Sequence, residues 1–163
     1  MRRTIRPLFA AVLLLAGGHA VAGTGVQMQS PVPFAEDNDI EDNIKSECRI
    51  GEQLAEYVKQ YAKVPVELTA QAPGGERVLQ LEIVDAVSMG NAFLGHQKFT
   101  KVKGTLFENG QKVASFKGRR NSMGGAFGGF KGSCSVLGRT VEVLGEDIGA
   151  WLASPVDGAN LGD

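Results

Sequence analysis

Apolar residues at the three- and four-residue spacing of an amphipathic helix mark two segments of this 163-residue chain. The first, residues 44–62, carries them at Ile50, Leu54, Tyr57 and Tyr61. The second, residues 133–152, carries them at Cys134, Leu137, Val141, Leu144, Ile148 and Trp151. Each segment also has a flank of small residues: Cys48, Gly51, Ala55 and Ala62 in the first, Gly138, Gly145 and Gly149 in the second. Because small residues let two backbones approach closely, we expect the two helices to pack against each other.

Apolar and polar residues alternate with a period of two in the middle of the chain, which predicts strands. Residues 77–87 form the clearest strand, with an apolar face made of Leu79, Leu81, Ile83 and Val87. Asp85 falls on this apolar face near the end of the strand, where we expect burial to stop. Residues 64–68 are a candidate for a short preceding strand.

A hairpin is predicted over residues 98–108 and 111–120, because Asn109-Gly110 between them supplies a glycine that takes a positive φ without steric cost. A two-residue turn would set an apolar residue opposite a lysine. A three-residue loop with the glycine in a bulge sets Val102 opposite Phe116 and keeps apolar residues together, so we expect this register. The outer face of the hairpin then carries four cations: Lys101, Lys103, Lys117 and Arg119.

These elements define an α+β fold class, a two-layer sandwich in which an antiparallel sheet of three to four strands has two helices packed on one face. The domain is expected over residues 44–153, which is long enough for a single core. Residues 23–43, with two prolines, are interpreted as a mobile acidic leader, and residues 154–163 as a flexible tail.

Residues 1–22 have the three parts of a secretory signal peptide: early arginines, an apolar run and a small-residue cleavage box that ends at Ala22. The apolar run is shorter than the roughly 20 residues needed to span a bilayer. Gly18 stands where a bacterial lipoprotein would have its acylated cysteine, so we expect no lipid anchor. The sequence therefore predicts a periplasmic or secreted protein without a transmembrane helix.

Charge is unevenly distributed along the remaining chain, in which 18 acidic residues oppose 14 basic ones once the three arginines of the signal peptide are gone. Residues 36–47 contain six acids and one lysine, whereas residues 98–131 contain eight bases and one glutamate. The basic outer face is either ordinary solvated surface or an anion-binding face for phosphates, polyanions or lipid headgroups. Its predicted anion-binding residues are Lys101, Lys103, Lys117 and Arg119. The acidic segment is a candidate cover for this face until a partner displaces it.

Cys48 and Cys134 are the only cysteines, and each lies in the first turn of a predicted helix. The two thiols meet if the helices lie side by side and parallel. In an exported protein such a pair favours a disulfide. A redox-active pair is the alternative, although the Cys-x-x-Cys spacing is missing.

A glycine-rich segment, residues 124–132, separates the last strand from the last helix. It fails as a nucleotide-binding loop, because Phe130 stands where that motif requires lysine and Lys131 where it requires serine or threonine. We interpret it instead as a connector that contacts a partner protein or a membrane surface. The predicted contact residues are Arg119, Arg120, Phe127, Phe130 and Lys131.

The sequence offers no convergent set of catalytic residues. Behind the signal peptide, His96 is the only histidine, which precludes a multi-histidine metal site and a recognisable Ser-His-Asp arrangement. The acids of residues 36–42 lack the spacing of a calcium-binding EF-hand. We therefore expect no enzyme, no metal site and no cofactor.

The order of the elements, with Gly-Gly-Phe-Lys-Gly-Ser-Cys134 and Gly145-Glu-Asp-Ile-Gly-Ala-Trp-Leu152, resembles a family of small bacterial envelope domains of unknown function over residues 46–152. Many of its members look like lipoproteins, and the architecture is similar to periplasmic accessory domains of secretion and assembly systems. The resemblance implies fold and compartment. Together with the residue inventory, it favours an exported non-catalytic binding or assembly-accessory module. We expect its partner to be another envelope protein, an anionic glycan or a lipid headgroup, and not a specific nucleic acid. An anion-binding surface protein and a small thiol or hydrolytic enzyme are the alternatives.

Overall fold

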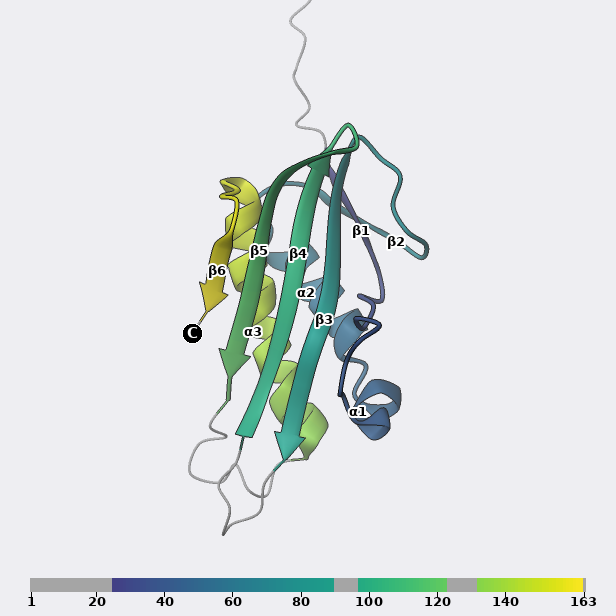
Figure 1. Cartoon of the computed structure of the whole chain (residues 1–163), viewed down its shortest axis with the longest axis vertical. Helices are drawn as coiled ribbons and strands as arrows, with labels where there is room; N and C mark the ends of the chain where they lie inside the picture. Colours follow the sequence, from purple (N-terminus) through teal and green to yellow (C-terminus); the bar gives the residue numbers. More distant parts are fainter. Residues whose placement is uncertain (1–24, 90–96, 123–131, 163) are drawn as a thin grey trace, which may run out of the picture.

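A computed structural model of the chain describes residues 25–89, 97–122 and 132–162. Within these residues six strands and three helices follow one another (Figure 1). In chain order they are β1 (Val26–Gln29), α1 (Asp42–Glu47), α2 (Ile50–Tyr61), β2 (Val66–Thr69), β3 (Arg77–Met89), β4 (Gln97–Glu108), β5 (Gln111–Asn121), α3 (Ser133–Ala153) and β6 (Ala159–Gly162). The strands form one sheet in the order β2-β1-β3-β4-β5-β6.

The sheet is mixed, which corrects the predicted fold class. β3, β4 and β5 pair antiparallel, but β1 pairs parallel with both β2 and β3, and β6 pairs parallel with β5. The prediction of an antiparallel sheet of three to four strands was therefore wrong, while the broader α+β description holds.

The parallel pairs follow from how the helices connect the strands. Neighbouring parallel strands need a long crossover, usually a helix. α1 and α2 supply it between β1 and β2, and α3 supplies it between β5 and β6. β1 and β6 lie in the segments predicted as a mobile leader, residues 23–43, and a flexible tail, residues 154–163, so both segments contribute to the sheet instead. Each strand has only four residues, too few to reveal a period of two.

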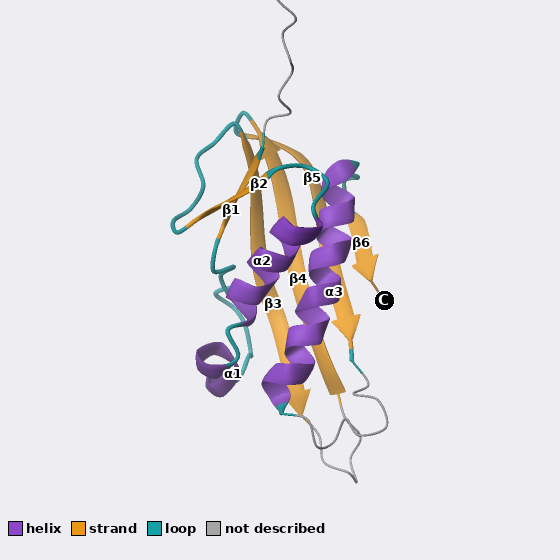
Figure 2. Ribbon diagram, turned by 180° about the vertical axis from the view of Figure 1, so that it is seen from behind, coloured by secondary structure: helices purple, strands orange, loops and turns teal. Residues whose placement is uncertain are grey.

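Helices α2 and α3 lie side by side across one face of the sheet (Figure 2). Their contact uses the predicted small residues. A Cβ atom added to Gly145 would lie 2.4 Å from Cβ of Tyr57, and one added to Gly149 would lie 2.8 Å from the backbone nitrogen of Ala62. Ile50 and Leu54 of α2 are buried, as are the apolar positions of α3 from Leu137 to Trp151, whereas Tyr57 and Tyr61 are only half-buried. Trp151 packs edge-to-face on Phe116 of β5 with ring centroids 4.7 Å apart.

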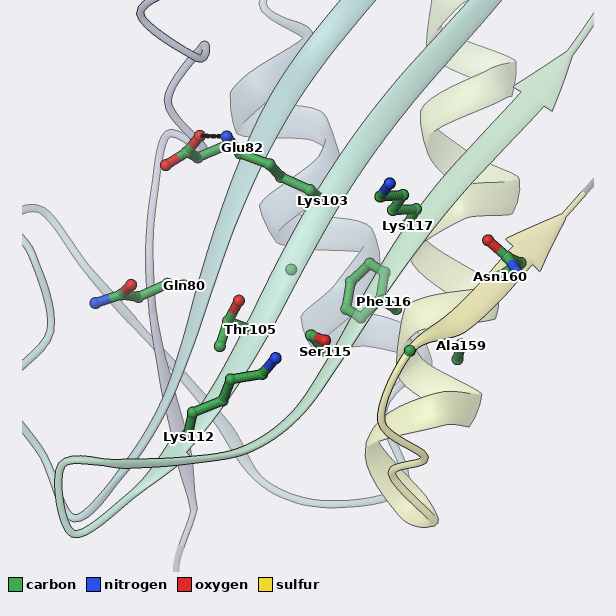
Figure 3. A pocket seen from close by; sticks show the side chains of 12 residues that line it. Gln80, Glu82, Lys103, Thr105, Lys112, Ser115, Phe116, Lys117, Ala159 and Asn160 are labelled. Carbon is green, nitrogen blue, oxygen red and sulfur yellow. Dashed lines mark ion pairs between the residues drawn. The ribbon is translucent and has the colours of Figure 1, made fainter.

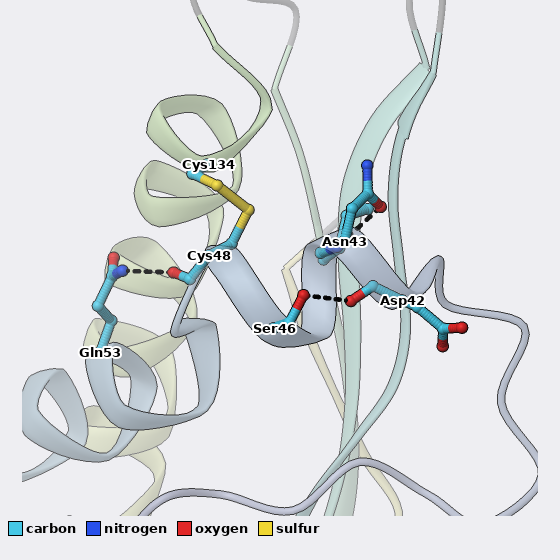
Figure 4. Close-up of a disulfide and its surroundings, with 7 residues drawn as sticks. Asp42, Asn43, Ser46, Cys48, Gln53 and Cys134 are labelled. Atoms are coloured by element: carbon cyan, nitrogen blue, oxygen red, sulfur yellow. Dashed lines mark hydrogen bonds between the residues drawn. A yellow bond between two sulfur atoms is a disulfide. The ribbon is translucent and has the colours of Figure 1, made fainter.

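The first predicted helix, residues 44–62, is interrupted. α1 ends at Glu47 and α2 begins at Ile50, and between them Arg49 adopts a left-handed backbone conformation with φ of 47°. The interruption leaves Cys48 at the end of α1 beside Cys134 in the first turn of α3. The two cysteines form the predicted disulfide, with an S–S distance of 2.04 Å (Figure 4).

The predicted hairpin has a different register from the expected one. Glu108 pairs with Gln111 across a two-residue turn, and a bulge then leaves Val113 between paired neighbours. As a result Gly104, and not the expected Val102, lies opposite Phe116. A shift of two residues leaves every side chain on its expected face, because side chains alternate with a period of two.

The disulfide fits an exported protein, since such bonds persist in oxidising compartments. In the part of the chain that the structure describes, no helix is long and apolar enough to cross a membrane. Residues 1–22, the predicted signal peptide, lie outside that part.

Candidate functional site

We name the face of the sheet opposite α2 and α3 the outer face. It carries the predicted anion-binding residues together with other polar side chains. Figure 3 shows part of this face, with polar side chains that come from β3, β4, β5 and β6. Its polar residues are Gln80, Glu82, Asp85, Lys101, Lys103, Thr105, Lys112, Ser115, Lys117, Arg119 and Asn160. The structure thus brings Lys101, Lys103, Lys117 and Arg119 together.

The four cations form two directly opposed pairs. In the antiparallel register of β4 and β5, Lys101 lies opposite Arg119 and Lys103 lies opposite Lys117. Directly opposed residues on one face of a sheet have their Cβ atoms about 5 Å apart, so like charges in these positions repel each other. The outer face therefore concentrates positive charge over β4 and β5.

Two carboxylates of β3 offset part of this charge. Asp85 lies 3.0 Å from Nζ of Lys101, and Glu82 lies 3.0 Å from Nζ of Lys103. Hydrogen bonding and charge attraction from Glu82 raise the pKa of Lys103 above its ordinary value, and Asp37 in the acidic segment contributes in the same direction. Asp85 reaches the outer face because the register of β3 shifts between Ile83 and Asp85. The sequence prediction placed Asp85 on the apolar face, since strict alternation cannot anticipate a bulge.

The two cations of β5 have different surroundings. Among the described residues, neither Lys117 nor Arg119 has a carboxylate within ion-pair distance. Nε of Arg119 donates a hydrogen bond to Oδ1 of Asn121 at 3.1 Å, and its guanidinium lies 4.6 Å from the centre of the Phe99 ring. Nζ of Lys101 lies 4.9 Å from the same ring. The sequence prediction missed Phe99, which has an exposed fraction of only 7% beneath these cations.

Two hollows lie on the outer face. The larger, about 480 Å³, extends from Gln80 on β3 to Asn160 on β6 and presents amide, hydroxyl and ammonium groups. The smaller, about 300 Å³, is lined by all four cations and by Leu161 of β6. At the edge of the larger hollow, a hydrogen bond from Ser115 lowers the pKa of Asp157, and the nearby charge of Lys112 lowers it further, against a smaller opposing effect of burial. The arrangement is suited to holding an extended polar ligand that carries negative charge.

The residues predicted to contact a partner are not brought together in the described part of the chain. Arg119 lies on the outer face, whereas Arg120 points to the helix side and forms an ion pair with Asp147 of α3. Phe127, Phe130 and Lys131 lie outside the described residues. The structure therefore separates two residues that the sequence prediction had grouped.

No protein-family model and no curated protein matches the sequence. Among solved structures, the chain is similar to the PelC dodecamer from Paraburkholderia phytofirmans, with 14% identity, a TM-score of 0.48 and coverage of 89% of this chain and 95% of that chain. A point variant of the same protein gives 15% identity, a TM-score of 0.47 and coverage of 77% and 86%. A minor lipoprotein from Acinetobacter baumannii gives 8% identity, a TM-score of 0.42 and coverage of 79% and 92%. Similarities this distant assign neither a family nor a function to the chain.

Proposed function

We propose that the protein is an exported, non-catalytic binding module of the bacterial cell envelope that binds an anionic partner on its outer face. The observation that carries the proposal is the direct opposition of Lys101 to Arg119 and of Lys103 to Lys117. Like charges in opposed positions destabilise a sheet. A bound anion between them converts this repulsion into attraction, so the arrangement is favourable in a complex.

The distribution of carboxylates favours binding of the anion nearer to β5 than to β4. Asp85 and Glu82 already offset part of the charge of the two lysines of β4. The charges of Lys117 and Arg119 on β5 are not offset in this way, because no described carboxylate pairs with either residue. We therefore assign the main contacts with the anion to Lys117 and Arg119, in the smaller hollow beside Leu161.

The chemistry of the larger hollow favours a partner with polar groups along its length. Gln80, Thr105 and Asn160 supply amide and hydroxyl groups that can hydrogen-bond sugar hydroxyls or a peptide backbone. An anionic glycan, a lipid headgroup or an acidic segment of another envelope protein has this chemistry. Stacking of nucleic acid bases is not favoured, because Phe99, the ring that these cations contact within the described residues, is covered by Lys101 and Arg119.

The bonded state of the two cysteines supports a binding role rather than the role of a thiol enzyme. A catalytic cysteine acts as a thiolate. Cys48 and Cys134 are bonded to each other, and Cys48 is 3% exposed. The outer-face carboxylates Glu82 and Asp85 are likewise engaged with lysines and not set opposite each other as an acid and base pair.

Charge reversal on β5 tests the proposal. The double variant Lys117→Glu, Arg119→Glu is compared with wild-type protein for binding to a sulfated polysaccharide, dextran sulfate, at a series of salt concentrations. We expect wild-type binding to weaken as salt rises, because screening reduces attraction between exposed charges. We expect the variant to bind at least about tenfold more weakly, which corresponds to about 1.4 kcal/mol spread over two lost contacts.

A matched control distinguishes the loss of outer-face cations from the change in the net charge of the protein. Lys59 and Lys63 are exposed residues in and after α2, away from the outer face, so Lys59→Glu, Lys63→Glu makes the same change in net charge. This control should retain wild-type affinity. Equal losses in the two double variants, or no binding by the wild-type protein at low salt, would contradict the proposed function.

A further inference from the structure

The outer face changes in character along the hairpin, row by row. Residues that lie directly opposite one another on neighbouring strands form these rows. The basic row in the middle of the face consists of Glu82, Lys103, Lys117 and Asn160. The next row toward the hairpin turn is uncharged and consists of Gln80, Thr105 and Ser115. Beyond it, Val78 lies opposite Phe107. The face therefore passes from basic to neutral polar to apolar side chains.

A third hollow, about 640 Å³, adjoins the outer face at the end of the sheet where the hairpin turns, and we name it the hairpin hollow. Its lining includes Val78, Gln80 and Phe107. Gln80 also lines the hollow of about 480 Å³, and that hollow shares Lys103, Lys117 and Asn160 with the hollow of about 300 Å³. The three hollows therefore follow one another along the hairpin as one groove.

The groove is long enough for several units of a linear polymer. Along β4 it extends from Phe107 in the hairpin hollow to Lys101 in the hollow beside Leu161. These two positions are six residues apart on the strand. A strand rises about 3.4 Å per residue, so this part of the groove is about 20 Å long. A single carboxylate or phosphate group fills only a small part of this length, so the groove is suited to a chain.

A chain bound in this groove meets side chains and not free backbone groups. β4 runs along the middle of the groove and pairs with β3 on one side and with β5 on the other. An extended peptide commonly binds by adding a strand to the edge of a sheet, through main-chain hydrogen bonds. β4 is not an edge strand, so the groove favours a ligand that is recognised through side chains.

The uncharged row has the chemistry of a sugar-binding surface. Within the part of the chain that the structure describes, the side chains of Gln80 and Thr105 form no hydrogen bond with other residues. Amide and hydroxyl groups supply both donors and acceptors, as the hydroxyl groups of a sugar do. Phe107 is half-buried and presents a ring on which the C–H face of a sugar can pack. A polysaccharide therefore matches this end of the groove better than a lipid headgroup, which has only one anionic end.

The charges along the groove are not uniform. Lys117 and Arg119 attract an anion at one end. Glu76 lines the hairpin hollow, so a second anionic group is repelled at the other end. A ligand that fits both ends has acidic units separated by neutral ones.

We propose that the groove binds a linear acidic polysaccharide in which charged sugars are separated by neutral sugars. An acidic sugar lies at Lys117 and Arg119, and the adjoining neutral part lies over Gln80 and Thr105 toward Phe107. This inference rests on the proposed function, because it uses the same cations. It adds the chemical class of the ligand and its direction along the sheet.

Chain length is the first test. Isothermal titration calorimetry compares hyaluronan oligosaccharides of two, four and six sugars, in which a uronic acid alternates with a neutral N-acetyl sugar. We expect the affinity to rise at least about fivefold from the disaccharide to the hexasaccharide, which is the effect of one or two hydrogen bonds. Hexagalacturonate has the same length but a carboxylate on every sugar, and it should bind no more tightly than the hyaluronan hexasaccharide.

An uncharged double variant tests the neutral row. Gln80→Ala, Thr105→Val should bind the hexasaccharide at least about fivefold more weakly than wild-type protein and the disaccharide equally well. The matched control is Gln60→Ala, Ser135→Ala, which changes two exposed uncharged residues of α2 and α3. It should bind both oligosaccharides as wild-type protein does. Thermal unfolding checks that both variants are folded.

The results distinguish this inference from the proposed function. If wild-type protein binds dextran sulfate through Lys117 and Arg119 but binds the disaccharide and the hexasaccharide equally, the polysaccharide groove is wrong and the proposed function stands. Equal hexasaccharide affinity in wild-type protein and the Gln80→Ala, Thr105→Val variant would also overturn the inference. So would tighter binding of hexagalacturonate, or of a glutamate peptide with as many carboxylates as the hexasaccharide. Hexasaccharide binding that survives Lys117→Glu, Arg119→Glu would instead contradict the proposed function.

Discussion

Arg119 and Arg120 are neighbours in the chain, yet they lie on opposite sides of the sheet. Arg119 is exposed on the outer face, with its guanidinium over the Phe99 ring. Arg120 faces α3 and is held by both oxygens of Asp147. The side chains in this second ion pair are only 29% and 21% exposed, so water screens them less than it screens the outer-face pairs. At the scale of single residues, one arginine is placed for binding and the other for stability.

Replacing each arginine with glutamine separates these two roles. Arg120→Gln leaves the carboxylate of Asp147 without its two charged donors, and we expect it to lower the free energy of unfolding by about 1–3 kcal/mol. Arg119→Gln removes an exposed group and should change the same quantity by less than about 0.5 kcal/mol. Urea unfolding followed by circular dichroism measures both. Similar losses of unfolding free energy in the two variants would show that the ion pair with Asp147 stabilises the fold no more than the exposed Arg119 does.

At the scale of elements, the glycines of α3 decide how closely it packs on α2. A Cβ atom at Gly149 would lie 2.8 Å from the backbone nitrogen of Ala62, and backbone atoms cannot move aside independently. A Cβ atom at Gly138 would meet only Oε1 of Gln53, the far end of a flexible side chain. The same substitution is therefore expected to have different consequences at two positions about three turns apart.

Gly149→Ala should lower the free energy of unfolding by about 1–3 kcal/mol, because it forces the two helices apart. Gly138→Ala should leave it unchanged or raise it by up to about 1 kcal/mol, since alanine is the better helix former. Thermal unfolding of both variants beside the wild-type protein gives the comparison. A stabilising effect of Gly149→Ala would mean that the helices are not in close contact at this point.

The long elements were accessible from the sequence because each repeats its pattern several times. The predicted strand at residues 77–87 corresponds to β3, the two arms of the hairpin to β4 and β5, and residues 133–152 to α3. β1 and β6 were missed because four residues hold two periods at most. Val26 and Met28 are fully buried and alternate with Gln27 and Gln29, but this pattern lasts for only four residues in a segment that contains prolines.

The site was predictable in part for a similar reason. Alternation correctly assigned the four cations to one face, and that assignment survived an error of two residues in register. Their partners could not be found in this way. Asp85 reaches Lys101 only because β3 carries a bulge, and Asn160 joins the outer face only because β6 pairs with β5. Phe99 lies two residues before Lys101 on β4, so the same alternation places it on this face, and the sequence prediction overlooked it.

At the scale of the whole molecule, the disulfide joins parts of the chain that are far apart in sequence. Cys48 and Cys134 are separated by 86 residues, and the segment between them includes all of α2, β2, β3, β4 and β5. A bond that closes a loop of this length restricts the unfolded chain much more than the folded one. Its contribution should therefore appear mainly in global unfolding.

The double variant Cys48→Ser, Cys134→Ser should lower the free energy of unfolding by about 4–5 kcal/mol, on the loop-closure estimate. Denaturant unfolding with and without reductant measures this loss. Reductant should lower the transition midpoint of the wild-type protein and leave that of the variant unchanged. Equal midpoints for the oxidised wild-type protein and the variant would contradict the expected contribution of the bond.

The position of β1 inside the sheet has a consequence for the order in which the protein is made. β1 pairs with Val66–Thr69 on one side and with Val78 and Leu79 on the other. Synthesis runs from the N-terminus, and domains generally fold as their chain emerges. β1 is therefore the first strand to appear and cannot be fully paired until Leu79 has followed it. During that interval Val26 and Met28, which are buried in the complete sheet, have no neighbouring strand to cover them.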